Sequence, residues 1–428
     1  MASASCTTGK GAAKRVYDEL QKLQPYRKIL RDRVPFKGDM KRIGESFQVP
    51  ALLAQPNGAT YIGANPTDTS LLAGQPMKVA QAIAYSYEFD LHEYTPWAVF
   101  ERQSASGEAA VDSYLGLMQM AMERSASVRA ELSYLRGQNA SGLGIVSSVT
   151  DHTTYATIVF TDATWSEAIW WSLGPGATLD SFTTTTKNNA TAALVLIGIS
   201  PSAKSIDVTY GGTLGSEIAA GDIIYAEGAL ATGGATAYEM PGLIVQAANV
   251  SGTSLGLAVS DYPNWAGNTF SVGGVMTTDA IEFYIGRLRN RMVDETLTAY
   301  MPDLTWRDFS SQLSALRFLD DSYSSGTQQT GQSEMAYNTK RMKKVEFELH
   351  PFLFDSEMLI QSDKACKVVG SRDVKYGLPS RVIGGNSDGQ GDLLQVTGKN
   401  SAETFASWDL GIVNRRPSTA VYLSGITH

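Results

Sequence analysis

The stretch "PMKVAQAIAYSYEFDLHEY" at residues 76–94 limits the possible folds more than any other part of this sequence. From residue 78 to residue 91, Val, Ile, Tyr, Phe and Leu on one face alternate with small or charged residues on the other. This period of two predicts a β-strand that would reach roughly 45 Å at about 3.3 Å per residue. A ribbon of that length is not stable alone, so it must lie on another surface, and a neighbouring subunit is a candidate.

The residues before this strand predict its partner. The segment 47–75, "FQVPALLAQPNGATYIGANPTDTSLLAGQ", is rich in turn residues and can supply a shorter strand beside it. A two-stranded β-hairpin followed by a return to the main body is therefore expected.

Two segments have helical periodicity. Residues 12–33, "AAKRVYDELQKLQPYRKILRDR", predict a helical arm that is kinked or interrupted at Pro25. Residues 106–137 predict a long helix that ends at Gly137 and spans about 45 Å. Its apolar stripe consists of Val111, Leu115, Met118, Met122, Leu132 and Leu135.

The segment 142–225 has a different pattern. Six short runs, "GIVSSV", "TYATIVF", "AIWWSLG", "AALVLIGI", "SIDVTY" and "DIIYAEG", are separated by turn residues. Short strands at this spacing predict a small barrel or sandwich inserted into the chain, with its two ends close together.

The rest of the chain, residues 226–428, mixes helices and strands. A helix with Thr278 as its N-cap follows the loop around Trp265, and another begins in "MPDLTWRDFSSQL" at residues 301–313. Strands are predicted at residues 343–350 and 418–426. Helices that pack on strands from distant parts of the chain indicate a discontinuous α+β domain.

Charge and cysteine content exclude several classes of protein. The net charge of −8 over 428 residues argues against a dedicated nucleic-acid-binding protein, although residues 1–45 hold eleven Lys and Arg against five Asp and Glu. The two cysteines, Cys6 and Cys366, are too far apart to indicate a disulfide framework or a zinc site. No 18-residue apolar run or signal peptide is present, so an intracellular origin without a membrane partner is expected.

Catalytic motifs are lacking. The four histidines, at positions 92, 152, 350 and 428, have no partner at metal-ligand spacing. The sequence therefore predicts no enzyme, no catalytic residue, no cofactor and no metal. A pair of carboxylates among the 43 Asp and Glu could still assemble in space, and the Trp and Tyr content leaves a β-rich carbohydrate-active enzyme as an alternative.

The order of these parts resembles that of the major capsid protein of tailed bacteriophages, which has the Hong Kong 97-like fold. The segment "SDYPNWAGNTFSVGG" at residues 260–274 is similar to the D-x-x-x-W-x-G-N loop that precedes a helix in that family. "MPDLTWRDFSSQL" looks like the segment that follows, and "GIVSSV…DATWSEAIWWSLG…AAGDIIYAEG" resembles the β insertion of some members.

The resemblance implies six regions. These are an N-terminal arm (1–46), an extended β-hairpin loop (47–105), the spine helix with the peripheral domain (106–144), an inserted β-barrel-like domain (145–225), an axial domain (226–340), and peripheral-domain strands with the C-terminal segment (341–428).

It also implies a function. The chain would assemble as hexamers and pentamers into an icosahedral shell in the bacterial cytoplasm, and the virion would enclose double-stranded DNA without sequence specificity. A portal protein and separate decoration proteins are further expected partners. Because no charged coiled-coil-like segment precedes the arm, any scaffolding would come from a separate chain. A nanocompartment shell of the same fold, enclosing protein cargo, is an alternative.

The expected subunit contacts come from the N-terminal arm, from the extended loop, and from the Trp265 loop with the helix that follows it. Arg287 and Arg291 share one face of the helix after the Trp265 loop, and Arg289 points about 200° away from Arg287. Ile281, Ile285, Leu288 and Met292 would pack that helix on the strands. The full set of expected interface residues is Arg287, Arg291, Tyr85, Tyr87, Phe89, Trp97, Trp265, Arg27 and Arg31. For Trp265 the alternative is an ordinary buried aromatic corner.

Overall fold

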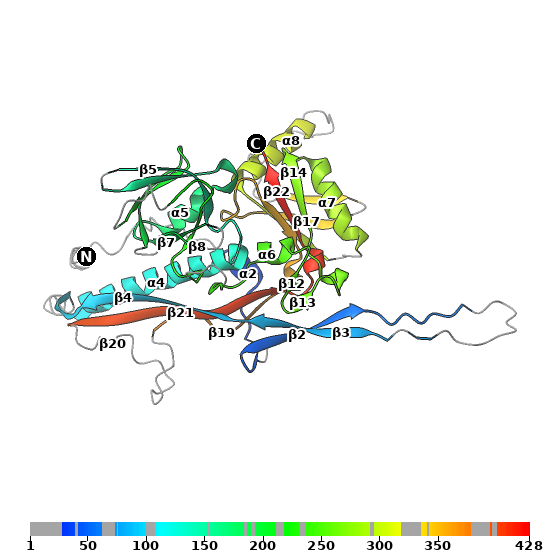
Figure 1. The fold of residues 1–428 in the computed structure, drawn as a ribbon, viewed down its shortest axis with the longest axis horizontal. Coiled ribbons are helices and arrows are strands. Elements are labelled where there is room, and N and C mark those ends of the chain that lie inside the picture. Colours follow the sequence, from blue (N-terminus) through cyan, green and yellow to red (C-terminus); the bar gives the residue numbers. More distant parts are fainter. Residues whose placement is uncertain are drawn as a thin grey trace, which may run out of the picture. The chain divides into compact units, whose positions relative to one another are not determined.

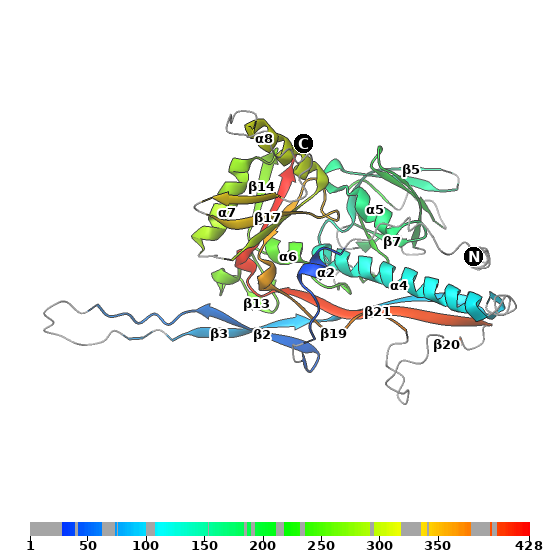
Figure 2. The same cartoon turned by 180° about the vertical axis from the view of Figure 1, so that it is seen from behind.

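The computed structural model describes residues 28–38, 42–61, 73–74, 76–99, 108–152, 154–183, 186–189, 193–210, 218–231, 236–291, 295–317, 335–339, 342–377, 394–395 and 400–428. The chain divides into two compact units, whose elements are labelled in Figures 1 and 2. Unit 1 holds residues 1–38, 86–241 and 370–411, and unit 2 holds residues 39–85, 242–369 and 412–428. Among the described helices, none is long and apolar enough to cross a membrane.

Unit 1 is built around the long helix α4, Glu108–Arg136. It runs along a sheet of β4 (Tyr87–Pro96), β19 (Cys366–Tyr376), β20 (Leu394–Gln395) and β21 (Ser401–Asn414), as Figure 1 shows. The hydroxyl of Thr404 on β21 donates to the sulfur of Met122 at 3.4 Å. Four residues of the predicted stripe, Met118, Met122, Leu132 and Leu135, are buried, and the side chains of Val111 and Leu115 lie outside the described part.

The end of α4 differs in detail from the prediction. Gln138, not Gly137, has the left-handed backbone, with φ of 58°. Gly137 is needed for another reason, because a Cβ there would lie 2.1 Å from the carbonyl oxygen of Met240. The glycine therefore allows close backbone packing.

The β insertion closes into a small barrel. Its strands are β5 (Gly144–Asp151), β6 (Ala156–Phe160), β7 (Thr178–Thr183), β8 (Thr186–Lys187), β9 (Leu194–Ser200), β10 (Ser205–Thr209) and β11 (Ile223–Ala226). The sheet order is β11-β5-β6-β10-β9-β7-β8, and β11 also pairs with β7, which closes the barrel. Ile223 pairs with Ile145, so the two ends lie together as predicted.

One predicted strand of the barrel is wrong. "AIWWSLG" lies within helix α5, Glu167–Leu173, which ends at Gly174 with φ of 71°. Trp170 is fully buried and stacks on Phe160 with ring centroids 4.8 Å apart, whereas Trp171 is exposed and donates to Glu167 one turn earlier. Packing of one tryptophan in the barrel core outweighs the strand preference of the aromatic run.

Unit 2 contains a six-stranded mixed sheet in the order β14-β22-β18-β15-β17-β16. Every residue of the central strand β15 is buried, as expected for a strand covered on both faces. The sheet consists of β14 (Thr269–Gly274), β15 (Leu297–Met301), β16 (Met335–Thr339), β17 (Met342–Leu349), β18 (Met358–Gln361) and β22 (Val421–Ile426). Helices α7 (Thr278–Asn290) and α8 (Asp303–Arg317) pack their apolar faces on it through Ile281, Ile285, Leu288 and Phe309.

Helix α7 starts one residue earlier than predicted. The side chain of Thr277, not Thr278, is the cap, because its hydroxyl oxygen accepts from the backbone N–H of Ala280 at 3.2 Å. Two adjacent threonines leave this choice open in the sequence. Met292, the last predicted packing residue, lies outside the described part of the chain.

A three-stranded ribbon completes unit 2. It contains β1 (Arg42–Ile43), β2 (Ser46–Ala54) and β3 (Lys78–Tyr85), and β2 pairs with β3 along its whole length. The predicted continuous strand from residue 78 to residue 91 is wrong, because it breaks at Ser86. β3 pairs with β2 in unit 2, whereas β4 pairs with β21 in unit 1, so each half has its own partner.

Distant parts of the chain contribute to each unit. Residues 342–369 and 412–428 share a sheet and a core with residues 242–317, whereas residues 370–411 belong to unit 1. The smaller elements are α2 (Leu30–Arg33) in unit 1, and α6 (Leu243–Ala248), β12 (Thr253–Ser254) and β13 (Leu257–Ala258) in unit 2.

Glu93 on β4 gives unit 1 a pH-dependent stability. It lies opposite Thr404, and burial raises the pKa of its carboxyl. The folded chain therefore binds this proton more strongly than the unfolded chain does, so the free energy of unfolding rises as pH falls from neutral through the raised pKa. We expect Glu93→Gln to raise the melting temperature at neutral pH and to reduce the gain on acidification, while Asp151→Asn on the exposed barrel surface serves as the control. An unchanged pH dependence in Glu93→Gln would contradict this assignment.

Candidate interaction surface

The ribbon of β2 and β3 has two chemically different faces. Cross-strand partners share a face in an antiparallel pair, so the register defines both faces. One face carries Phe47 with Ala84, Val49 with Ala82, and Ala51 with Ala80. The other carries Ser46 with Tyr85, Gln48 with Ile83, Pro50 with Gln81, and Leu52 with Val79.

The first face is the inner face of the ribbon. Its side chains form a core with Leu257, Trp265, Val369 and Val413, and the small alanines of β3 allow this close packing. The backbone N–H of Ile83 donates to the carbonyl of Leu255 at 2.8 Å, which adds a backbone tie to the same unit. The ribbon is thus attached to unit 2 through its inner face and, at Ile83, through the edge of β3 next to Leu255 and Gly256.

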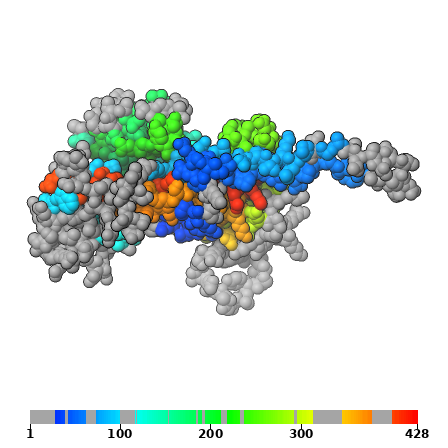
Figure 3. Space-filling view, turned by 90° about the horizontal axis from the view of Figure 1, so that it is seen from below, coloured from blue at the N-terminus to red at the C-terminus, as the bar shows by residue number. Residues whose placement is uncertain are grey.

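The second face is exposed and largely apolar. Leu52 is 59% exposed, Val79 55%, Tyr85 52% and Ile83 37%. Figures 1 and 3 show the ribbon, coloured blue, extending past the sheet and helices of its own unit. A row of large apolar side chains kept in water is unfavourable and typically marks a protein contact surface. We call these four residues, with Pro50, the outer ribbon face.

The predicted interface residues of the alternating stretch fall into different units, because the boundary between the units lies between Tyr85 and Ser86. Tyr85 is on the outer ribbon face. Tyr87 and Phe89 belong to unit 1, where the Tyr87 hydroxyl accepts from Gln138 at 3.4 Å and Phe89 stacks on Trp408 with ring centroids 5.3 Å apart. Trp97 is half-buried in the same unit, and its backbone N–H donates to Asn400.

The interface role predicted for Trp265 does not fit its position. Its side chain is 3% exposed within the core beneath the ribbon, and its indole N–H donates to the carbonyl of Ser254 at 3.1 Å. This burial favours the alternative of a buried aromatic corner. The D-x-x-x-W-x-G-N loop packs Trp265 against the inner face of the ribbon, in the core of unit 2.

Arg31 is also occupied within its own unit. Its guanidinium donates to Asp373 at 2.6 Å and its side chain is mostly buried. The buried carboxylate of Glu131 on α4 accepts the backbone N–H groups of Ile29, Leu30 and Arg31 at 2.7–3.1 Å. This fixes the start of the described chain on α4, and the interface role of Arg31 stays a prediction. Arg27 lies outside the described residues.

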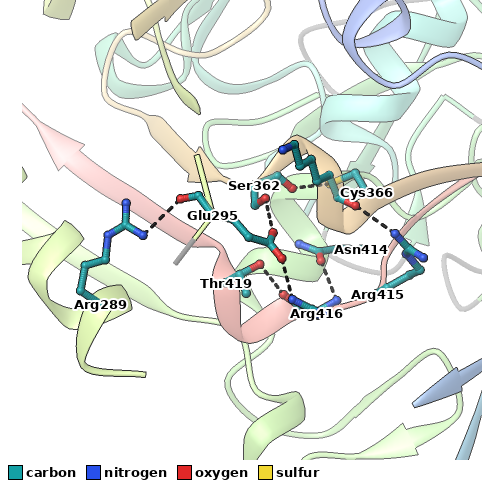
Figure 4. A network of polar contacts seen from close by, with 9 residues as sticks. Arg289, Glu295, Ser362, Cys366, Asn414, Arg415, Arg416 and Thr419 are labelled. Atoms are coloured by element: carbon teal, nitrogen blue, oxygen red, sulfur yellow. Dashed lines mark hydrogen bonds and ion pairs between the residues drawn. The ribbon is translucent and has the colours of Figure 1, made fainter. Parts of the chain in front are cut away.

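The arginines of α7 point in two different directions, as helix geometry predicts. Arg287 and Arg291 are exposed, and the Arg287 guanidinium lies 5.0 Å from the ring centroid of Phe283. Arg289 instead donates to the backbone carbonyl of Glu295 at 3.1 Å. In Figure 4 the Glu295 carboxylate joins Arg416, at 2.6 Å, and Ser362, at 2.5 Å. Arg289 thus belongs to an internal network, and the other two are available for a partner.

The sequence prediction missed Leu52, Val79 and Ile83 as surface residues. The run "FQVPALLA" at residues 47–54 alternates as clearly as β3 does, so the pairing of Leu52 with Val79 was available as a signal. What the pattern did not show is which face is inward. Large apolar residues would ordinarily face the core, but here the alanines do.

The described residues contain no group of three His, Cys, Asp or Glu side chains arranged to hold a metal ion. Cys366 is buried, and burial raises the pKa of its thiol, which makes it a poor nucleophile. His350 is fully buried, and its Nδ1 accepts from the backbone N–H of Phe352 at 3.3 Å. These groups have structural roles in the described part of the chain.

No protein-family model matches the sequence, and no curated protein matches it either. Among solved structures, the Cyanophage A-1(L) capsid asymmetric unit is similar with a TM-score of 0.54 and 11% identity, over 96% of each chain. The capsid of Cyanophage P-SCSP1u covers 97% of this chain and 93% of its own, with 10% identity and a TM-score of 0.47. A protein of Gordonia phage Cozz covers 97% and 91%, with 10% identity and a TM-score of 0.44. Because the likeness to the A-1(L) structure runs along nearly all of both chains, this protein has the fold of that phage capsid chain.

Proposed function

We propose that this chain is a structural protein that assembles as hexamers and pentamers into an icosahedral capsid enclosing the double-stranded DNA of a tailed phage. The observation that carries the proposal is the shared fold with the Cyanophage A-1(L) capsid chain over 96% of both chains. It is a shell protein and not an enzyme.

The outer ribbon face supplies the main contact in this proposal. Rings of five or six copies use heterologous contacts, in which two different patches of the same chain meet. An exposed apolar face on this ribbon suits such a contact, because it can lap over a neighbouring copy. The α4 helix would act as the spine of the peripheral domain, and residues 1–46 would act as the N-terminal arm.

The charge of the chain suits a container for DNA. A shell wall with many strong phosphate contacts would retain the genome through counterion release. A net charge of −8 keeps most of the wall from binding DNA tightly, so the genome is enclosed without sequence specificity. A portal and any scaffolding or decoration proteins would be separate chains, with assembly in the bacterial cytoplasm and the mature protein in the virion.

Expression of the full chain tests this function. We expect sedimentation far faster than a 46.0 kDa protomer, and negative-stain images of closed shells. Shells that hold one protein cargo and no nuclease-protected nucleic acid would favour a nanocompartment. A protomer that stays unassembled and hydrolyses a polysaccharide would contradict a structural role.

Arg287 and Arg291 are proposed to contact an acidic surface of a neighbouring copy. Removing a charge from a buried interface pair typically costs about 2–5 kcal/mol, whereas an exposed ion pair contributes about 0–1 kcal/mol. We expect Arg287→Ala with Arg291→Ala to leave the protomer melting temperature nearly unchanged and to lower particle yield at least about tenfold. Arg307→Ala on α8 is the control. Normal particle yield from the double variant would remove these two residues from the interface.

A further inference from the structure

A cavity of about 390 Å³ in unit 1 has apolar walls on two sides. Phe89 and Leu91 of β4 form one wall, and Leu132 of α4 belongs to the other. The Phe89 ring is held in place by Trp408, on which it stacks with ring centroids 5.3 Å apart. Small-molecule sites in proteins commonly have mostly apolar walls and volumes of about 300–1,000 Å³. The cavity therefore has the size and the walls of a site for a small ligand.

The guanidinium of Arg129 on α4 gives this cavity a charged group. The residue is largely removed from water, and this desolvation lowers the pKa of its guanidinium. In the part of the chain that the structure describes, no acceptor lies within hydrogen-bond or ion-pair distance of the Arg129 side chain. A charge taken out of water is normally paired. An arginine in this position therefore favours a bound anion.

The carboxylate that attracts Arg129 does not neutralise it. Glu239 acts on Arg129 from beyond ion-pair distance, and its carboxylate accepts the hydroxyl of Ser133 at 2.5 Å. Burial raises the pKa of Glu239, so its own negative charge is disfavoured in this environment. Arg136, two turns further along the same face of α4, adds a second positive charge to the lining. The inner wall is therefore more positive than negative.

The other acidic residues around the cavity are held elsewhere or exposed. The Thr95 side chain contacts α4, so the odd-numbered side chains of β4 face that helix and the even-numbered ones face away. Glu88 and Asp90 therefore point to the opposite side of the sheet, where Arg372 lies 3.4 Å and 3.9 Å from their carboxylates. Glu227 is exposed, and water weakens the effect of its charge.

We propose that this cavity binds a small organic anion, with its carboxylate on Arg129, near the positive charge of Arg136, and its apolar body against Phe89, Leu91 and Leu132. A planar guanidinium fits a carboxylate because it can donate two parallel hydrogen bonds to it. The site lies within one chain, so the inference does not depend on the shell function.

Isothermal titration calorimetry of the full chain with naphthoate tests this proposal. Naphthylmethylamine has the same apolar body with the opposite charge, and inorganic phosphate is an anion without an apolar body. We expect one naphthoate to bind per chain, at least about tenfold more tightly than either of the other probes. No naphthoate binding would overturn the proposal. Equal binding of the amine would remove the role of Arg129, and equal binding of phosphate would remove the role of the apolar walls.

Substitution of Arg129 locates the site. Loss of a charged hydrogen bond weakens binding by at least about tenfold, so we expect this increase in the dissociation constant of naphthoate for Arg129→Gln. Arg129→Lys keeps the charge without the paired donors, and we expect an intermediate affinity; it also replaces Arg129→Gln should that variant not fold. Arg124→Gln, on the same helix but about 140° away from Arg129, is the control and should bind normally. Unchanged affinity in the Arg129 variants would place naphthoate elsewhere, for example on the outer ribbon face, and would overturn the proposal.

Discussion

Leu52→Glu combined with Val79→Lys is expected to abolish particle formation while the protomer stays folded. The two residues are cross-strand partners on the outer ribbon face, so the introduced charges are opposite and do not repel each other within the ribbon. Burying one such apolar side chain contributes about 1.5–3 kcal/mol, so two lost at each contact remove on the order of 4 kcal/mol. This corresponds to about a thousandfold in the association constant at every ribbon contact.

Sedimentation velocity measures the loss of particles, and circular dichroism measures the melting of the protomer. Ile197→Glu is a matched control, because it places a charge on an exposed apolar side chain of the barrel. That variant should assemble normally. Normal particles from the ribbon double variant would show that the outer ribbon face is not an assembly contact, and an unfolded protomer would place these side chains in the core.

Trp265→Ala should cause the largest loss of protomer stability. Truncating a buried aromatic residue typically costs about 3–5 kcal/mol, because the cavity left behind is only partly filled. Here the indole packs in the core beneath the ribbon, and its N–H bonds the carbonyl of Ser254, which would lose its partner. Trp171→Ala, which truncates an exposed tryptophan on α5, should cost well under 2 kcal/mol.

Thermal melting of the two variants side by side checks this expectation. A melting temperature lowered by several degrees for Trp265→Ala, with little change for Trp171→Ala, is the predicted result. If Trp265→Ala instead melts like the original chain but fails to assemble, the residue acts at an interface after all. The inner face of the ribbon would then lack the support that the structure assigns to it.

The strands and helices of this chain could largely be predicted from sequence in segments whose apolar residues repeat with a single period, either that of a helix or that of a strand. The α4 helix and the β2–β3 hairpin follow from local patterns, and so does the barrel as a whole. The break at Ser86 could not be predicted, because the alternation passes through it unchanged and only the two different partner strands separate β3 from β4. The α5 helix was missed because burial of Trp170 is a tertiary effect.

The interface residues were harder to predict than the fold. Arg31 is one of many basic residues in its segment, and its partner Asp373 is 342 positions away. Trp265 is a large aromatic in a loop, which suits either a surface or a core. By contrast, the opposite directions of Arg287 and Arg289 follow from helix geometry alone, and the structure confirms them.

The most direct test of the central claim is a cryo-electron microscopy reconstruction of the particles formed by the full chain. The account predicts a closed icosahedral shell of pentamers and hexamers in which Leu52, Val79, Ile83 and Tyr85 of each ribbon are buried against another copy. A shell in which these four side chains face solvent, or a preparation that contains only free protomers, would contradict it.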